Sequence, residues 1–224
     1  LRVGEDPSRV IDERVALNLG VLGQETTGAG GFAMALRSVP ALLEYCEMVK
    51  QHAKPNAPIF NFTNPSGIVT QALHDAGYNN VFGICDAPSG FTRQLQNLYG
   101  VQDNQISLRC YGLNHLSWFD QVKINGHDVT TDLINDPRLY QKTEMKLFEP
   151  KIAKLSKNLL LNEYLYFYYY RERALQSILN AKQTRGESVL AINSATLEKL
   201  LTIDIDNNME QAFHIFIDAY LTRE

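Results

Sequence analysis

The chain is organised around the segment Val81-Phe-Gly-Ile-Cys85-Asp86-Ala-Pro88-Ser-Gly90. An apolar run followed by Asp, Pro, Ser and Gly predicts a short β-strand that ends in a turn. The segment Tyr111-Gly-Leu-Asn114-His115-Leu-Ser-Trp118 repeats this arrangement, with an imidazole at its tip. A thiolate and an imidazole suit a divalent metal of borderline softness. The spacing between Cys85 and His115 matches no fixed metal-binding motif, so the surrounding sequence has to decide whether they form a site.

Two strand-turn-helix units surround the first of these segments. Residues 57–61 predict a strand that leads into the turn Thr63-Asn64-Pro65-Ser-Gly67, and residues 68–76 predict a helix. The next unit has its strand at 80–85 and its helix at 91–98. This alternation predicts a parallel sheet covered by helices. Such sheets bind ligands beyond the carboxyl ends of their strands, and four candidate residues lie there: Asn61, Asn64, Cys85 and Asp86.

The first 31 residues are polar and glycine-rich, and we expect residues 1–12 to form a loop. The stretch Gly23-Gln24-Glu25-Thr-Thr27-Gly28-Ala-Gly30-Gly31 comes directly before an apolar helix predicted at residues 32–52, which Pro40 should kink or split. A glycine-rich turn before a helix N-terminus can contact an anion or a cofactor. A plain flexible loop is the alternative interpretation.

The pattern changes near residue 105. Residues 106–124 are rich in strand-forming side chains, and Asn125-Gly126 is a strong hairpin signal, so antiparallel strands are expected. Helices are predicted at 162–181, 187–201 and 208–221. We therefore expect two domains. Residues 1–105 form an α/β piece that lacks its opening strands, and residues 106–224 form an α+β domain.

Composition and charge exclude several classes of function. The net charge of -4 and the pI near 5.8 provide no basic surface for a nucleic acid. We find no apolar run near about 18 residues and no leader, which predicts neither a membrane span nor a signal peptide. Three cysteines without a framework spacing favour a reducing cytoplasm. The chain starts without a methionine in an expected loop and stops at the end of a predicted helix, which suggests an excised fragment.

Each candidate side chain also has an ordinary structural interpretation. Cys85 could be a metal ligand, a nucleophile or a small buried apolar group. His115 could be a ligand or a hydrogen-bonded structural residue. Tyr164 and Tyr168 share one helix face within a tyrosine-rich run. Most such stripes belong to cores or interfaces, and a tyrosine that acts as a base needs a nearby cation.

Two arginines are candidates for binding an anion. Arg9 lies in the expected N-terminal loop, and Arg185 lies between two predicted helices. Arginine matches a phosphate or carboxylate with two parallel hydrogen bonds. A solvated surface cation is the alternative in both cases.

Five ordered motifs resemble family 4 glycoside hydrolases, which are NAD- and Mn-dependent 6-phospho-glycosidases. They are Asp12-Glu13-Arg with Gly23-Gln24-Glu25-Thr-Thr27-Gly28, Asn61-Phe-Thr63-Asn64-Pro65-Ser-Gly67, Gly83-Ile-Cys85-Asp86-x-Pro88, Gly112-Leu-Asn114-His115 and Tyr164-Leu-x-x-Tyr168. The resemblance covers most of residues 2–190 and is strongest to 6-phospho-β-glucosidases. It implies a Rossmann-like parallel sheet followed by an α+β domain of the lactate/malate dehydrogenase C-terminal type.

The resemblance also implies a role for each candidate residue. Cys85 and His115 match metal ligands for Mn2+ or another divalent ion. Asn64 and Arg9 match substrate-binding positions, Arg185 lies where a phosphate-binding residue is expected, and Gln24, Glu25 and Asn61 are assigned to the cofactor NAD. Tyr164 is the expected catalytic base, with Tyr168 as the alternative. Asp86 departs from the pattern, because Asp after this Cys is typical of 6-phospho-α-glucosidases, where it is thought to act as the acid.

The activity implied by the resemblance is hydrolysis of 6-phospho-β-glucosides through oxidation at C3, deprotonation at C2 and elimination, an exception to two-carboxylate hydrolysis. The expected partner is a small phosphorylated glucoside, and no nucleic acid or membrane is expected as a partner. The protein is expected to be a cytoplasmic homodimer or homotetramer. The chain lacks the dinucleotide fingerprint, so on its own it is expected to be inactive. Three alternatives remain: a 6-phospho-α-glucosidase, a malate/lactate-type dehydrogenase, and an inactive fragment that binds a sugar phosphate.

Overall fold

The computed structural model describes residues 6–24, 26–160 and 162–223. These residues fall into two compact units, each of which is considered by itself. The helical unit consists of residues 1–41 and 175–224, and the mixed unit consists of residues 42–174. Two helices, α2 (Gly28–His52) and α9 (Arg171–Asn180), run from one unit into the other along the chain.

The mixed unit begins with the predicted strand-turn-helix pattern. Strands β1 (Ile59–Asn61) and β2 (Val81–Gly83) pair in parallel, and α3 (Ser66–Asp75) connects them. Helix α4 (Ala87–Tyr99) follows β2 and begins with a proline in its first turn. A proline is tolerated there because the N–H that it lacks has no helical partner anyway. The predicted parallel sheet with covering helices is therefore confirmed.

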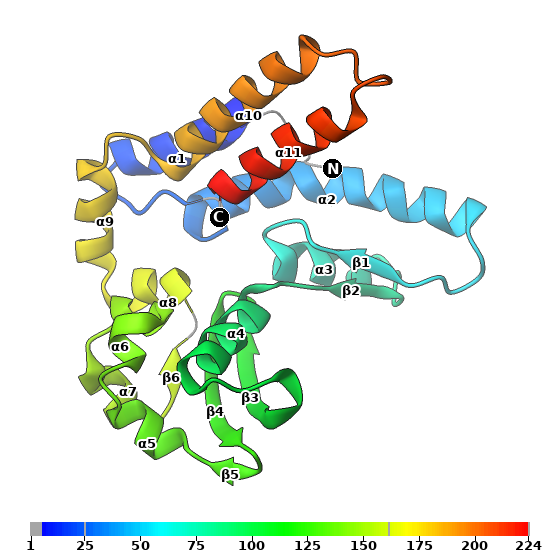
Figure 1. The fold of residues 1–224 in the computed structure, drawn as a ribbon. Helices are drawn as coiled ribbons and strands as arrows, with labels where there is room; N and C mark the ends of the chain where they lie inside the picture. Colours follow the sequence, from blue (N-terminus) through cyan, green and yellow to red (C-terminus); the bar gives the residue numbers. More distant parts are fainter. Residues whose placement is uncertain (1–5, 25, 161, 224) are drawn as a thin grey trace. The chain divides into compact units, whose positions relative to one another are not determined.

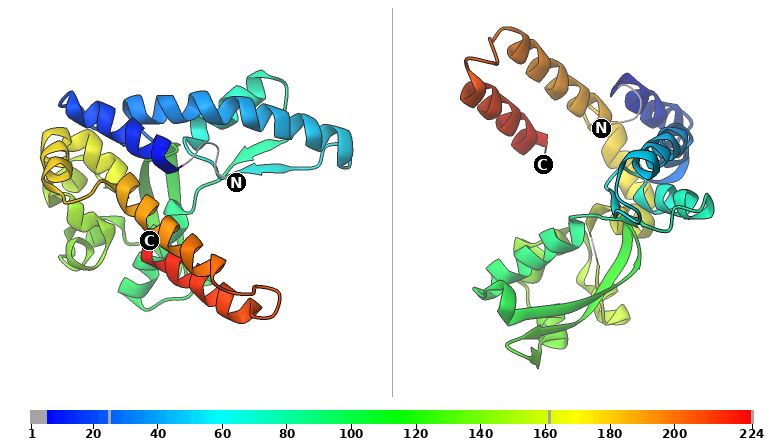
Figure 2. Two further views of the ribbon diagram at one scale, coloured as in Figure 1. Left: turned by 90° about the horizontal axis from the view of Figure 1, so that it is seen from above. Right: turned by 90° about the vertical axis from the view of Figure 1, so that its right-hand side faces the viewer.

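Antiparallel strands follow the short helix η1 (Asp103–Gln105). They are β3 (Ile106–Leu113), β4 (Leu116–Ile124) and β5 (His127–Asp128), in that order in the sheet. Figure 2 shows the long β3–β4 hairpin in its right-hand view. Asn125 and Gly126 form the turn before β5 with φ angles of 49° and 81°, as the Asn-Gly pair predicts. The strand β6 (Leu159–Leu160), which pairs with β4, was not expected from the sequence.

Short helices complete the core of the mixed unit. They are α5 (Thr130–Asn135), α6 (Leu139–Lys142), η2 (Glu144–Leu147), α7 (Pro150–Ser156) and α8 (Asn162–Tyr169). Phe91 of α4 stacks on Phe119 of β4, with ring centroids 5.1 Å apart and both side chains fully buried. The single helix predicted at 162–181 is wrong. It is divided into α8 and α9 at Tyr170, whose hydroxyl accepts a hydrogen bond from the Glu149 N–H at 2.9 Å.

The helical unit contains α1 (Asp6–Asn18), α10 (Arg185–Leu201) and α11 (Met209–Arg223) besides the first part of α2. Helices α1 and α10 pack side by side, as Figure 1 shows. The loop expected at residues 1–12 is wrong from Asp6 onward, because α1 begins there. The buried face of α1 consists of Arg9, Glu13, Ala16 and Leu17. Two of these four residues are charged, so the helix does not show an apolar period.

Pro40 lies inside α2, which continues without a break to His52. The expected split is therefore wrong. Pro40 is exposed, and so is Leu36, whose carbonyl loses its helical partner. The lost hydrogen bond thus falls on the exposed side of the helix. Among the described helices, none is both long and apolar enough to cross a bilayer.

Candidate functional site

The turn between β1 and α3 is built by the side chain of Asn61. This residue is 5% exposed, and its amide donates to the Thr70 hydroxyl at 3.1 Å and accepts from the Thr63 N–H at 3.0 Å. Asn64 follows in the same turn, half-buried, before a cis bond to Pro65. Asn61 thus shapes the loop that presents Asn64. The predicted contact of Asn61 with NAD stays a prediction, and within the chain its amide serves the turn.

The turn after β2 presents Cys85 and Asp86. Asp86 is the N-cap residue of α4, and its carbonyl accepts the Gly90 N–H at 2.9 Å. Its carboxylate is exposed and makes no capping hydrogen bond within the described residues. Cys85, directly before it, is half-buried. The thiol and the carboxylate therefore differ in their surroundings although they are neighbours in the sequence.

His115 lies in the two-residue turn that joins β3 to β4. Its φ angle is 61°, in the left-handed region, and its side chain is buried, with the residue 8% exposed. Gly112 precedes the turn with a φ of 117°, and a Cβ there would lie 2.3 Å from the carbonyl oxygen of Leu116. Only glycine fits such a position. The hairpin thus holds the imidazole at a fixed place beside the end of β3.

The structure brings Cys85 and His115 together. The Cys85 Sγ lies 3.5 Å from the His115 Nε2, a distance that allows a sulfur hydrogen bond. For comparison, zinc bonds of about 2.3 Å to sulfur and about 2.1 Å to nitrogen, at an angle of roughly 105°, give the same separation. The pair therefore fits two ligands of one divalent ion. No cluster of three or more His, Cys, Asp or Glu side chains that could hold a metal occurs within the described part of the chain.

Tyr164 of α8 lies against the same imidazole. Its ring stacks on His115 with centroids 3.8 Å apart and an angle of 3° between the planes. Tyr168, one turn further along α8, is 67% exposed and packs edge-on against Tyr169. The helix register alone left these two tyrosines equivalent. The geometry favours Tyr164, because its ring is the one that contacts His115.

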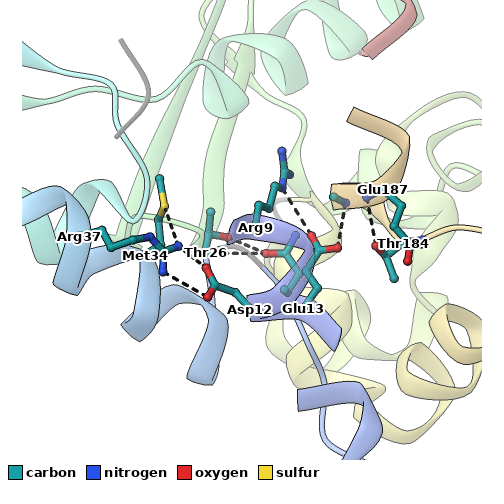
Figure 3. A network of polar contacts seen from close by, with 10 residues as sticks. Arg9, Asp12, Glu13, Thr26, Met34, Arg37, Thr184 and Glu187 are labelled. Carbon is teal, nitrogen blue, oxygen red and sulfur yellow. Dashed lines mark hydrogen bonds and ion pairs between the residues drawn. The ribbon is translucent and has the colours of Figure 1, made fainter. Parts of the chain in front are cut away.

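A second group of candidate residues lies in the helical unit, where α1 meets the start of α10 (Figure 3). Arg9 is 8% exposed, and its Nε lies 3.5 Å from the Glu13 Oε1. The other oxygen of Glu13 accepts the Gly186 N–H at 2.8 Å. Arg185, the first residue of α10, is exposed beside this contact. The two arginines predicted to bind an anion therefore come from elements that meet at Glu13.

The start of α10 is reinforced by a capping box and an ion pair. The Thr184 hydroxyl accepts the Glu187 N–H at 3.2 Å, and the Glu187 carboxylate accepts the Thr184 N–H at 2.9 Å. Arg14 of α1 binds the same carboxylate through two nitrogens, both at 2.7 Å. Two hydrogen bonds lower the pKa of Glu187 below its ordinary value: the one from the Thr184 N–H, which has the larger effect, and the one from Arg14. The junction is thus held by a carboxylate that stays ionised.

The predicted cofactor loop lies next to this junction. The Gln24 Oε1 accepts the N–H of Thr26 at 2.9 Å and the hydroxyl of Thr26 at 3.0 Å, so it closes a local turn. A Cβ at Gly23 would lie 2.1 Å from the carbonyl oxygen of Glu13. Glu25, predicted with Gln24 to contact NAD, lies outside the described residues.

Sequence reasoning missed the buried contact of Glu13 beside Arg9 and the structural ion pair of Arg14 between α1 and α10. Glu13 and Arg14 directly follow the expected loop at residues 1–12, in a polar stretch for which no helix was predicted, so a buried role was not considered. The available signal was the four-residue spacing of Arg9 and Glu13, which places opposite charges on one helix face.

Two sequence models of one enzyme family match the chain. The model described as "Family 4 glycosyl hydrolase" matches residues 1–101, and the model "Family 4 glycosyl hydrolase C-terminal domain" matches residues 110–224.

Individual relatives include enzymes named for both anomers. The 6-phospho-beta-glucosidase BglT of Thermotoga maritima is 34% identical over 202 residues, which are 90% of this chain and 48% of that protein. The 6-phospho-alpha-glucosidase 1 of Lacticaseibacillus paracasei is 38% identical over 125 residues, which are 55% of this chain and 28% of that protein. The chain spans about half the length of the curated relatives it matches over most of its residues.

A solved structure of the 6-phospho-beta glucosidase from Thermotoga maritima with manganese, NAD+ and glucose-6-phosphate is similar in fold. It superimposes with a TM-score of 0.79 at 32% identity, and the match covers 91% of this chain and 49% of that one.

Proposed function

Because the chain belongs to family 4 of the glycosyl hydrolases, we propose that the full-length protein hydrolyses 6-phospho-β-glucosides with NAD and Mn2+ or another divalent metal. The observation that carries this proposal is the cluster of Cys85, His115 and Tyr164, in which a thiol, an imidazole and a phenol converge from three different elements. The relative solved with manganese, NAD+ and glucose-6-phosphate supports the same choice of ligands.

Cys85 and His115 would hold the metal, since their 3.5 Å separation fits two ligands of one ion. When bound, the metal supplies Lewis-acid polarisation of sugar oxygens, and NAD supplies reversible removal of hydride. Sulfur is a soft ligand for Mn2+. We therefore expect this pair to bind softer divalent ions such as Co2+ or Cd2+ at least as well as Mn2+.

Tyr164 would receive the proton from C2 of the sugar. Its ring is fixed by stacking on His115, so the hydroxyl is held in one orientation relative to the ligand pair. Fixed orientation is a principal source of rate enhancement in proton transfer and elimination. Asp86, exposed at the N-terminus of α4, would donate a proton to the departing aglycone oxygen.

Arg9, Arg185 and Asn64 would bind the substrate. The two arginines belong to one junction in the helical unit, and guanidinium groups match the geometry of a phosphate. Asn64 lies in the turn shaped by Asn61 and would hydrogen-bond sugar hydroxyls. These assignments follow the resemblance residue by residue, and the turn geometry at Asn61 supports the last one.

The β-anomer is favoured because the relative that covers 90% of this chain is a 6-phospho-β-glucosidase. Asp86 and the 38% identity to a 6-phospho-α-glucosidase over a shorter stretch favour the α-anomer, which is the second candidate. A malate/lactate-type dehydrogenase is set aside, because both family models belong to glycosyl hydrolases.

A hydrolysis assay on the full-length protein tests the proposal. It compares p-nitrophenyl 6-phospho-β-glucoside with the α-anomer, each with and without NAD and Mn2+. We expect release of p-nitrophenol from the β-anomer only when both additives are present. Activity that ignores NAD and metal would overturn the redox-elimination chemistry, and faster hydrolysis of the α-anomer would reassign the substrate.

We also propose a cytoplasmic homodimer or homotetramer. Cys46, Cys85 and Cys110 are all free thiols, as expected in a reducing compartment. Light scattering of the purified full-length protein measures its mass, and a monomer would contradict this assembly.

A further inference from the structure

Glu13 is a buried carboxylate without a role in the proposed function. It is 2% exposed on the face of α1 that packs on α10. Removing a carboxylate from water costs several kcal/mol unless partners compensate for it. Such a residue in place of an apolar side chain calls for an explanation from its contacts.

The two oxygens of Glu13 reach two different elements. Oε1 lies 3.5 Å from the Nε of Arg9, one turn earlier in α1, and Oε2 accepts the Gly186 N–H at 2.8 Å. Gly186 directly follows Arg185. One carboxylate therefore links the two arginines that are predicted to bind the substrate, one through its side chain and one through the adjacent backbone.

Two glycines make room for Glu13. A Cβ at Gly186 would lie 2.7 Å from its Oε2, and a Cβ at Gly23 would lie 2.1 Å from its carbonyl oxygen. Both distances are shorter than real contacts allow. Gly23 directly precedes Gln24 in the predicted cofactor loop. Three segments with predicted site residues are thus packed around this one glutamate.

The first turn of α10 already uses two of its N–H groups within the chain. The Gly186 N–H donates to Glu13, and the Glu187 N–H donates to Thr184. An anion bound at this junction would therefore depend on the arginine side chains more than on these two backbone donors. This makes the placement of Arg9 and Arg185 decisive.

We propose that Glu13 is a positioning residue, which orients Arg9 and fixes the start of α10 so that Arg9 and Arg185 bind the phosphate group of the substrate together. This inference rests on the proposed function, because it takes the phosphorylated sugar as the ligand. Glu13 itself does not touch the substrate, and its effect passes through the two arginines.

The test uses the full-length protein with NAD and Mn2+, in the variants Glu13→Gln and Gly186→Ala. Binding of glucose 6-phosphate is measured by isothermal titration calorimetry, and KM and kcat are measured with p-nitrophenyl 6-phospho-β-glucoside. Glu13→Gln should weaken binding and raise KM by about tenfold, equivalent to about 1.4 kcal/mol. The kcat should stay within about twofold, as expected when binding common to ground and transition states is lost. Gly186→Ala should act alike, because its methyl group displaces the carboxylate.

Arg14→Gln is the matched control. It removes the ion pair to Glu187, which joins the same two helices without involving Glu13. This variant should lower the melting temperature and leave KM unchanged. In an Arg9→Ala background, Glu13→Gln should add little further loss of binding, since residues that act through one another are not additive.

Different failures have different signatures. If the Glu13→Gln and Gly186→Ala variants fold and bind glucose 6-phosphate with wild-type affinity, the positioning role is overturned. The same holds if Arg14→Gln raises KM as much as they do, because the effect would then be one of helix packing. A wild-type protein that neither binds glucose 6-phosphate nor hydrolyses the β-glucoside overturns the proposed function, and the role assigned to Glu13 falls with it.

Discussion

The left-handed backbone at His115 predicts an unusual order of stability. At a φ of 61°, an alanine is destabilised by about 1–2 kcal/mol, because its Cβ comes too close to the following carbonyl oxygen. Glycine accepts this angle freely but loses about 0.5–1 kcal/mol more chain entropy on folding. We therefore expect His115→Gly to be more stable than His115→Ala by about 0.5–1 kcal/mol, the reverse of the order in a helix or strand.

Both variants should be less stable than the wild type. Each loses the ring that stacks on Tyr164 at 3.8 Å, and aromatic contacts of this kind contribute about 0.5–1.5 kcal/mol beyond the buried area. The ring is removed in both cases, so its contribution cancels when glycine and alanine are compared. The comparison isolates the backbone term.

Urea unfolding of the two full-length variants, followed by circular dichroism, measures this difference, and titration with Mn2+ measures the metal site. Neither variant carries an imidazole, so both should lose affinity for the metal to the same extent. An alanine variant that is as stable as the glycine variant refutes the left-handed turn. Wild-type affinity for Mn2+ in both variants removes His115 from the proposed metal site.

Three further predictions concern the hairpin, the helix junction and the thiol. Gly112→Ala should destabilise the protein by about 3 kcal/mol or more, because a φ of 117° and a backbone clash at 2.3 Å act together; thermal unfolding measures this, and a change below about 1 kcal/mol would contradict the hairpin geometry. The folded pKa of Glu187 lies below its ordinary value of 4.5, so its contribution to stability is present above that pH and is lost as the pH falls through the folded pKa. The free energy of unfolding of Glu187→Gln should therefore differ from that of the wild type near neutral pH and approach it in acid. A difference that stays constant with pH would count against the hydrogen bonds from Thr184 and Arg14. Cys85→Ser should abolish the thiolate-to-metal absorption of the Co2+ form, whereas the control Cys110→Ser should retain it; retention in Cys85→Ser would exclude Cys85 as a ligand.

The sequence predicts the parts of the fold that depend on local pattern. The strand-turn-helix units around Asn61 and Cys85 follow from apolar runs that end in turn residues, and the turn at Asn125 follows from the backbone preference of Asn-Gly. The proximity of Cys85 and His115 could be proposed because both were expected at the ends of strands. Their 3.5 Å separation could not, since it depends on how the β3–β4 hairpin packs.

Features stabilised by distant partners escaped the sequence analysis. Helix α1 was missed because its buried face contains Arg9 and Glu13, and Glu13 is compensated there by the distant Gly186 N–H. The strand β6 has two residues, too few for a period to be visible, and exists through its pairing with β4. In both cases tertiary contacts determine the local structure, and residue patterns do not record them.

The contact between Glu13 and Gly186 joins residues 173 positions apart, which bears on the order in which the protein is made. At translation rates of about 5–20 residues per second, α1 exists for about 9–35 s before its partner has been synthesised. During that interval the Glu13 carboxylate has to remain in water, so the packed face of α1 cannot form. Contacts of such long sequence separation also slow folding itself. The junction of α1 and α10 is therefore expected to form late. The mixed unit, which lies between these two helices along the chain, should be folded before it.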